Sequence, residues 1–186
     1  MRPKAKRRKP CVVIDTSVLL SGISGFREPY VRNKNASSAL LYRWAEENNF
    51  LWLVTEEILE EYKEVLGRLG VRPGLIGSVI NLIRERAEEV DVRSSVEISP
   101  DPKDDAFCIC AKEGEADFIV TLNPKDFPQN RLKTKVVPPS HFARWRPASG
   151  KKKSLVGGGV ADRVARASEK AAGGGGPGHG FEFGEI

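Results

Sequence analysis

The chain is poor in the residues on which several kinds of site depend. Its 186 residues include two histidines, three cysteines and one methionine. The histidines, His141 and His179, lie in the last expected helix and in the C-terminal segment, so no convincing Ser/His/Asp catalytic triad is present. The cysteines, Cys11, Cys108 and Cys110, lie within apolar runs and form no CxxC pair. This pattern is typical of buried thiols in a reducing compartment rather than of disulfides or zinc ligands, and we expect a cytoplasmic protein.

Long apolar runs are also missing. No stretch approaches the ~20 residues that span a bilayer, so we expect no membrane association. The N-terminal segment MRPKAKRRKP is basic and leads straight into a strand-like segment, without the apolar region of a secretory signal, and we expect none. A chain of this length can bury one good core.

Charge is concentrated at the two ends of the chain. The formal net charge is +5, and much of the excess comes from residues 2–9 and 151–153. Glycine runs at residues 157–159 and 173–176 leave too few apolar residues for a second core. We expect a basic N-terminal tail at residues 1–10, one domain at 11–146 and a flexible Gly/Lys-rich tail at 147–186. Basic tails favour polyanionic partners only weakly, because most charged runs are simply solvated.

Short apolar runs alternate with helical patterns along the expected domain. Strands are expected at residues 11–14 and 18–20 around Asp15, at 50–54, 117–122 and 135–137, with an edge strand or connector at 91–99. Helices are expected at residues 36–47, 56–69 after a Thr55 N-cap, 74–89, 104–113 and 140–145. This alternation predicts a parallel sheet with helices on both faces. In such sheets, functional groups collect beyond the carboxyl ends of the strands.

Several acids fall where a strand or helix is expected to begin or end. These are Asp15, Glu61, Asp104, Asp117 and Asp126. An unpaired buried carboxylate is costly, so acids that converge on one edge of the sheet would form a site for a hard cation. Asp117 begins its strand, at the opposite end from Asn123, and we expect it to cap the preceding turn instead.

Helical periodicity distinguishes neighbouring acids. Glu61 borders an expected buried stripe, whereas Glu60 points away from it. The stripe consists of Ile58, Tyr62, Val65 and Leu66. Asp104 shares the inward face of its helix with Phe107, Cys108 and Ala111, whereas Asp105 is expected to face outward. Each inward acid also fits an ordinary role: Glu61 as a boundary residue and Asp104 as a first-turn acid that the helix dipole stabilises.

A loop after the first strand carries groups suited to RNA. Arg27, Arg32 and Lys34 can hold phosphates, and Tyr30 can stack on an unpaired base. Lys125 and Arg131, further along the chain, are additional candidates. A solvated loop fits the same residues, and no motif that reads bases is present.

Four segments in this order resemble a PIN domain over roughly residues 11–145: IDTSVLLSG, TEEILEEYKEVL, DPKDDAFCICAKEGEADFIVTLNPKDFP and VVPPSHFARW. The subgroup to which the chain is most similar is the toxin components of toxin–antitoxin systems, the VapC-like endoribonucleases. The resemblance implies a three-layer α/β/α fold with a central, mostly parallel sheet of about five strands. It also implies a hydrolase that cleaves RNA with Mg²⁺ or Mn²⁺. A cognate antitoxin and a homodimer are the protein partners that it suggests.

Carried onto this sequence, the resemblance assigns catalysis and metal binding to Asp15, Glu61 and Asp104. Asp105 is the alternative for the third acid, and Ser17 is the hydroxyl that orients the first acid or a metal-bound water. Asn123 occupies the fourth acidic position, where it offers a carbonyl without a charge, and Asp126 is expected to compensate as a further ligand.

Two functions stay open from these residues. One is RNA hydrolysis by metal-activated water, and the other is an RNA-binding or processing module that cleaves weakly or not at all, which Asn123 favours. A haloacid-dehalogenase-like phosphatase fits less well, because it needs a second Asp where this chain has Ser17.

Overall fold

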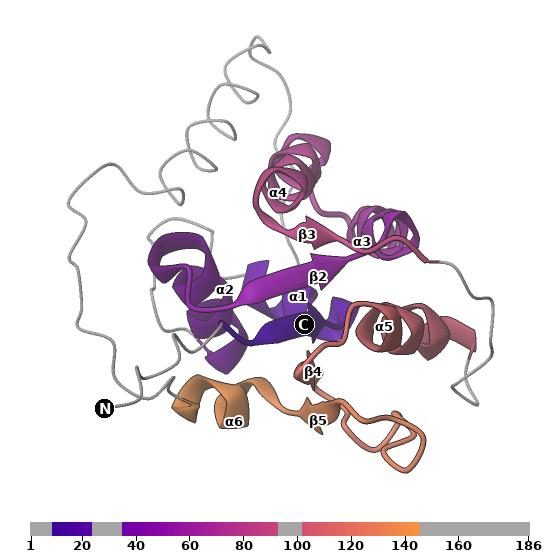
Figure 1. Ribbon diagram of the computed structural model, residues 1–186. Coiled ribbons are helices and arrows are strands. Elements are labelled where there is room, and N and C mark those ends of the chain that lie inside the picture. Colours follow the sequence, from indigo (N-terminus) through magenta and orange to yellow (C-terminus); the bar gives the residue numbers. More distant parts are fainter. Residues whose placement is uncertain (1–8, 24–34, 93–101, 146–186) are drawn as a thin grey trace, which may run out of the picture.

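The computed structural model describes residues 9–23, 35–92 and 102–145 (Figure 1). The expected C-terminal tail, nearly all of the expected N-terminal tail and most of the expected segment at 91–99 lie outside these residues. The RNA-binding candidates Arg27, Tyr30, Arg32 and Lys34 lie outside them as well.

A five-stranded parallel sheet forms the centre of the molecule, as predicted, with the strand order β3-β2-β1-β4-β5. The strands are β1 (Cys11–Ile14), β2 (Leu51–Val54), β3 (Glu88–Glu89), β4 (Phe118–Val120) and β5 (Lys135–Val137). Val12, Val13 and Ile14 of the central strand are completely inaccessible to solvent. An apolar run of this kind is typical of a parallel strand that is covered on both faces.

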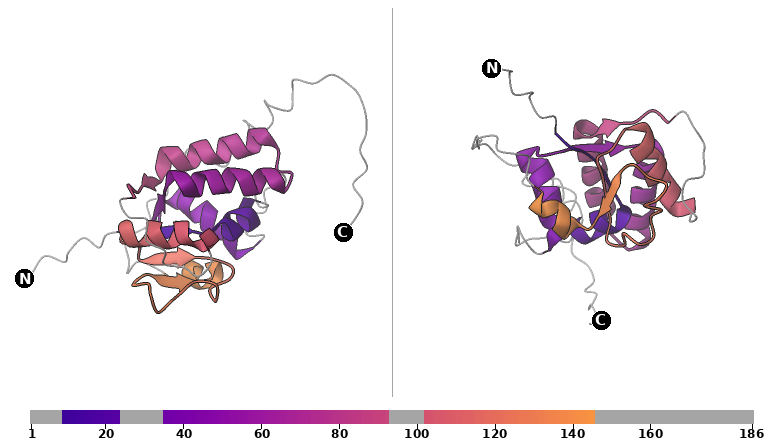
Figure 2. Two further views of the ribbon diagram at one scale, coloured as in Figure 1. Left: turned by 90° about the vertical axis from the view of Figure 1, so that its right-hand side faces the viewer. Right: turned by 60° about the horizontal axis from the view of Figure 1, so that its bottom comes forward.

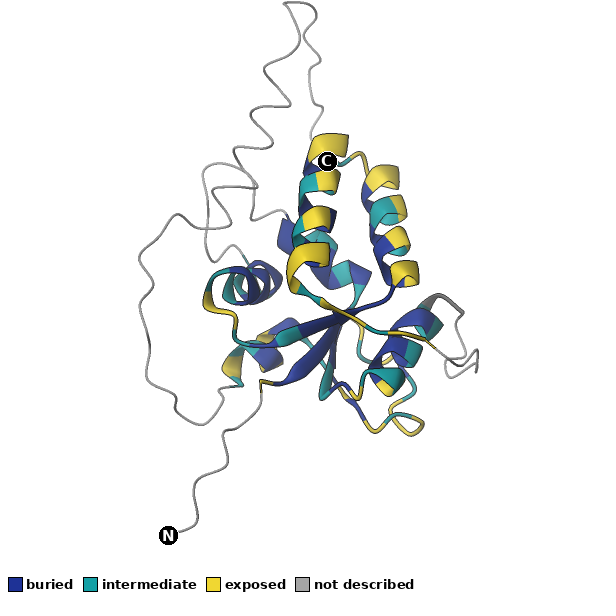
Figure 3. Ribbon diagram, turned by 45° about the horizontal axis from the view of Figure 1, so that its top comes forward, coloured by how far each residue is buried: buried dark blue, intermediate teal, exposed yellow. Residues whose placement is uncertain are grey.

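Six helices surround the described part of the sheet. They are α1 (Thr16–Ile23), α2 (Ala36–Glu47), α3 (Glu56–Arg68), α4 (Pro73–Arg86), α5 (Pro102–Glu113) and α6 (Pro139–Arg144). Figure 1 shows α2 and α6 on one side of the strands and α5 on the other, and α5 contacts β1, β2 and β4. Helices α3 and α4 lie side by side, with their exposed residues on the outer surface (Figures 2 and 3). The arrangement is the three-layer α/β/α fold that the sequence predicts.

Two expected elements were wrong. Residues 18–20 belong to α1 rather than to a strand, because the N–H groups of Val18 and Leu19 donate to the carbonyl oxygen of Asp15 at 3.0 and 3.2 Å. Both side chains are buried, and a short apolar run of this kind does not distinguish a buried strand from a buried helix. Glu88 and Glu89 were expected to end a helix but form β3, where they pair with Leu53 and Val54.

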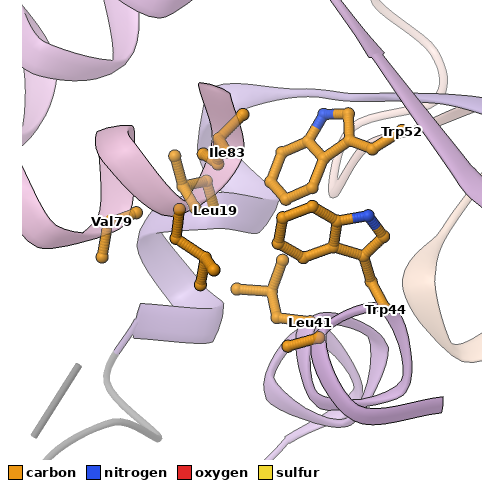
Figure 4. A pocket seen from close by; sticks show the side chains of 8 residues that line it. Leu19, Leu41, Trp44, Trp52, Val79 and Ile83 are labelled. Atoms are coloured by element: carbon orange, nitrogen blue, oxygen red, sulfur yellow. The ribbon is translucent and has the colours of Figure 1, made fainter. Parts of the chain in front are cut away.

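Aromatic side chains fill the core where α1, α2 and α4 meet above β2. The rings of Trp44 and Trp52 pack edge to face with their centroids 4.8 Å apart, beside Leu19 and Ile83 (Figure 4). An apolar cavity of about 20 Å³ remains between them. Its lining is apolar apart from the indole N–H groups, fewer polar partners than a buried water needs, so the cavity is a packing gap rather than a polar site.

At Gly22, the backbone of α1 packs tightly against Leu41 and Ser37 of α2. A Cβ atom at Gly22 would overlap the Leu41 side chain and lie 3.1 Å from the carbonyl oxygen of Ser37. Gly77 in α4 is exposed, and a Cβ atom there would meet nothing within 4 Å. Alanine substitutions at these two helical glycines can therefore be compared, because only Gly22 is tightly packed.

We expect Gly22→Ala to lower the free energy of unfolding by about 1–3 kcal/mol, the usual cost of overpacking a core. Gly77→Ala should raise it by roughly 0.5–1 kcal/mol, because alanine favours the helix. Urea denaturation of both variants measures the difference. Equal or greater stability of Gly22→Ala relative to the wild type would show that α1 and α2 do not pack in this way.

Candidate functional site

The candidate site lies at the carboxyl end of the central strand. Asp15 directly follows β1, and its N–H donates to the carbonyl oxygen of Val120, the last residue of β4, at 2.9 Å. Helix α1 begins at the next residue, Thr16, and Thr121 directly follows β4. Adjacent parallel strands therefore bring Asp15 and Thr121 together although they are 106 residues apart.

Two hydroxyl groups hold the same oxygen of the half-buried Asp15 carboxylate. Ser17 Oγ donates to Oδ2, and Thr121 Oγ1 donates to the same atom at 2.7 Å. Each hydroxyl also accepts a backbone N–H from the turn after β4, that of Leu122 at 3.3 Å for Ser17 and that of Asn123 at 3.0 Å for Thr121. No described residue forms a hydrogen bond to Oδ1, so this oxygen is the one left for a ligand.

Glu61 is joined to this group through Thr16. It lies half-buried on α3, and its Oε1 accepts a hydrogen bond from Thr16 Oγ1 at 2.5 Å. The neighbouring Glu60 is exposed, as helical periodicity predicts. Burial raises the pKa of Glu61, and the nearby charges of Asp15 and Asp104 raise it further against the lowering effect of the Thr16 hydrogen bond. The three acids therefore share one electrostatic environment.

Asp104 lies half-buried in the first turn of α5. Phe107, Cys108 and Ala111 are buried on the same helix, which agrees with the expected inward face. Asp105 was expected to face outward but is also half-buried. Burial raises the pKa of the Cys108 thiol to about 12, with a contribution from Asp104 and Asp105, so this cysteine stays protonated and unreactive.

The carboxylate oxygens of the acids are the kind of ligand that a hard cation prefers. In the described part of the chain, however, they are not arranged around a common metal position. Carboxylate and hydroxyl oxygens are the ligands that Mg²⁺ and Mn²⁺ prefer. In residues 9–23, 35–92 and 102–145, however, no group of three His, Cys, Asp or Glu side chains is arranged to hold a metal ion. Asn123 and Asp126 are exposed in the turn after β4, and the Asp126 N–H donates to the Asn123 carbonyl oxygen at 3.1 Å.

Asp117 is a structural residue at the opposite end of the sheet. Its Oδ2 accepts the N–H of Cys11, the first residue of β1, at 2.9 Å. Asp117 therefore binds the start of the neighbouring strand β1, whereas we expected it to cap the turn before its own strand. Lys125 and Arg131, the described candidates for RNA contacts, are both exposed.

Sequence reasoning missed three residues that support the site. Thr16 and Thr121 hold Glu61 and Asp15, and the Tyr62 hydroxyl donates to the carbonyl oxygen of Ile14 next to Asp15. Burial raises the pKa of Tyr62 well above its ordinary value, so the hydroxyl remains a donor. Two signals were available: Thr16 is adjacent to Asp15, and Thr121 ends a buried strand.

Comparison with known proteins identifies the family of the chain. The sequence model of the PIN domain matches residues 11–125 of the 186, more than half of the chain. The matched segment contains Asp15, Glu61, Asp104 and Asn123 and ends just before Asp126. No curated protein sequence gives a significant match. Among the described helices, none combines the length and the hydropathy needed to cross a bilayer.

The raised pKa of Glu61 predicts how stability depends on pH in metal-free protein. Well below the ordinary pKa of 4.5, both folded and unfolded states hold the proton. As the pH rises, the unfolded chain loses its proton first, so the free energy of unfolding falls until the pH passes the raised pKa. Glu61→Gln removes this loss, and its amide oxygen can still accept from Thr16.

We therefore expect Glu61→Gln to be more stable than the wild type at pH 7 in EDTA, with the difference vanishing below about pH 3.5. Chemical denaturation across this pH range measures it. Glu85→Gln is the control, because Glu85 is exposed on α4 and is not among the charges that raise the pKa of Glu61, so it should follow the wild-type profile. A Glu61→Gln variant less stable than the wild type at pH 7 would contradict the expectation.

Proposed function

Because the chain belongs to the PIN domain family, whose members are generally nucleases, we propose that it is an endoribonuclease that depends on Mg²⁺ or Mn²⁺. The observation that carries the proposal is that the half-buried Glu61, joined by Thr16 to the end of the central strand, feels the charges of both Asp15 and Asp104. Burial and these two charges raise its pKa, which supports a shared site for the three acids.

The side chains around Asp15 would prepare it to hold a cation. Ser17 and Thr121 fix Oδ2 and leave Oδ1 without a hydrogen bond from the described residues, while Thr16 fixes one oxygen of Glu61. Asp15, Glu61 and Asp104 would hold the ion, with Asn123, Asp126 or Asp105 as further oxygen ligands. A bound divalent cation supplies a more acidic water and neutralises charge that develops on the phosphate. The residues of the chain would orient the cation.

A second candidate function is an RNA-binding or processing module with little or no cleavage. Asn123 favours it, because an amide in the fourth acidic position removes a negative charge from the site. The open arrangement of the acids in the described part of the chain favours it too. Metal binding without RNA cleavage would distinguish this function from the first.

The resemblance to toxin components supports a finer proposal about partners and location. A cognate antitoxin protein would cover the acidic edge, and a homodimer is the assembly that such proteins commonly form. The three cysteines are free and buried, which suits a reducing cytoplasm.

RNA cleavage tests the proposed chemistry directly. We expect a panel of tRNA and single-stranded RNA to be cut with Mn²⁺ or Mg²⁺ and to stay intact in EDTA. Asp15→Asn, Glu61→Gln and Asp104→Asn should each reduce the rate by about 100-fold or more, the scale for losing one group that stabilises charge. Gel analysis of labelled RNA provides the rates.

Glu85→Gln is the control for Glu61→Gln, since it makes the same change at an exposed position of α4 that is not among the charges acting on Glu61. It should cleave like the wild type. Cleavage that persists undiminished in EDTA would overturn the role of the metal. Binding of Mn²⁺ without any cleavage would favour the non-cleaving module.

Asn123→Asp tests the missing charge. Adding a carboxylate in the turn after β4 should tighten Mn²⁺ binding by about tenfold, which corresponds to about 1.4 kcal/mol, because ligand charge tunes the affinity of oxygen sites. Calorimetric titration of the wild type and the variant measures the change. An unchanged affinity would mean that position 123 does not contribute to the cation site.

A further inference from the structure

A pocket of about 240 Å³ lies at the opposite end of the sheet from the acids. Its lining residues come from the amino ends of three strands and from the end of α6: Pro10, Asp117, Phe118, Lys135 and Trp145. None of these residues belongs to the candidate active site. The one acid among them, Asp117, directs Oδ2 to the Cys11 N–H and so belongs to the framework of the sheet.

Trp145 forms a fixed aromatic wall of this pocket. Its ring stacks on that of Phe142 with the centroids 6.0 Å apart and an interplanar angle of 13°. It also packs edge to face on Phe118, with the centroids 5.9 Å apart. Phe142 is buried, while Trp145 is half-buried. The ring is therefore held in place by the core and still reaches the surface, which suits the stacking of a planar group.

Positive charge gathers around the same pocket. Lys135 is exposed at the start of β5, and Lys9 is exposed next to Pro10. In sequence, the segment before Pro10 carries Arg2, Lys4, Lys6, Arg7, Arg8 and Lys9 without an acidic residue, and Arg146 and Lys151–153 follow Trp145. In sequence, the residues before Pro10 and after Trp145 are thus basic, and Lys9 and Lys135 are exposed beside the pocket residues, so a polyanion is the ligand that the charge favours.

We propose that this pocket binds a nucleobase of single-stranded RNA, which stacks on Trp145 while Lys135 and Lys9 contact the adjacent phosphates. A surface aromatic ring between cations is the combination with which proteins hold single strands, since every base has a face that can stack. An acidic protein segment would use the cations but not the ring. The identity of the ligand as RNA rests on the proposed function, whereas the pocket and its charge do not.

Such a contact would extend the substrate across the molecule. The two sites lie at opposite ends of short parallel strands, and the four residues of β1 span about 13 Å. A few nucleotides of single-stranded RNA can cross this distance. The pocket would then select unpaired RNA on one side of the scissile bond and leave the chemistry to the acids.

RNA binding by the full chain tests the pocket without requiring cleavage. The parent protein is Asp15→Asn in EDTA, and the probe is a fluorescein-labelled single-stranded oligoribonucleotide followed by anisotropy. Trp145→Ala should weaken binding by about 5- to 150-fold, the effect of losing one stacked base. Lys135→Gln should reduce the slope of log affinity against log salt by about 0.7, the value for one phosphate contact with a single strand.

Lys63→Gln is the matched control, because it removes one partly buried lysine charge, paired with Glu60, from α3, which lies beyond β2 from this pocket. It should retain the parent slope. An equal loss of slope in Lys63→Gln, or unchanged binding by both Trp145→Ala and Lys135→Gln, would overturn the proposal. If Trp145→Ala fails to fold, the salt slope of Lys135→Gln decides, because this exposed residue lies outside the aromatic cluster.

RNA cleavage and RNA binding, measured together, distinguish a wrong pocket from a wrong proposed function. Metal-dependent cleavage by the wild type with unaltered RNA binding in the pocket variants would retain the nuclease and remove the pocket. Weakened binding by Trp145→Ala together with no cleavage would retain the pocket in a non-cleaving module. A parent protein that does not bind RNA at all would overturn the pocket, leaving an acidic protein as the partner to examine.

Discussion

The site depends on the hydrogen bonds that stabilise the partly buried Asp15 carboxylate. A carboxylate that is half removed from water needs hydrogen bonds, and here two hydroxyls supply them to one oxygen. Those hydroxyls are in turn fixed by the backbone of the turn after β4. The Asp15 N–H also joins β1 to β4, so the position of the carboxylate, the start of α1 and the path of the last turn form one connected arrangement. Disturbing any part would move Asp15.

Electrostatic repulsion works against this arrangement in the absence of a cation. Asp15 and Asp104 both raise the pKa of Glu61, which means that the folded chain keeps like charges closer than the unfolded chain does. The hydrogen bond from Thr16 offsets part of this cost. A site of this kind is stabilised by whatever positive charge enters it, whether a metal ion or a basic group of a partner. Stability and ligand binding are therefore coupled at the same three side chains.

The sequence predicts the parallel sheet and the inward positions of Glu61 and Asp104, because strand and helix periods determine which face a residue occupies. It predicts Thr55 as an N-cap for the same local reason, and Thr55 Oγ1 does accept the N–H of Ile58. The hydroxyl partners could not be predicted, since Thr121 meets Asp15 only through strand pairing. Periodicity also gives no distances between elements, and so it could not show that the acids in the described part of the chain form no closed metal site.

The separation between Asp15 and its second hydroxyl has a consequence for biosynthesis. Thr121 follows Asp15 by 106 residues, and β4, which aligns the two, is translated after α1 to α5. A nascent chain whose first motif has left the ribosome therefore still lacks the Thr121 hydroxyl and the β4 backbone that help to orient this acid. For a protein proposed to cut RNA, this order means that the site becomes complete only after most of the domain has left the ribosome. The nuclease is then at a distance from the RNA that is being translated.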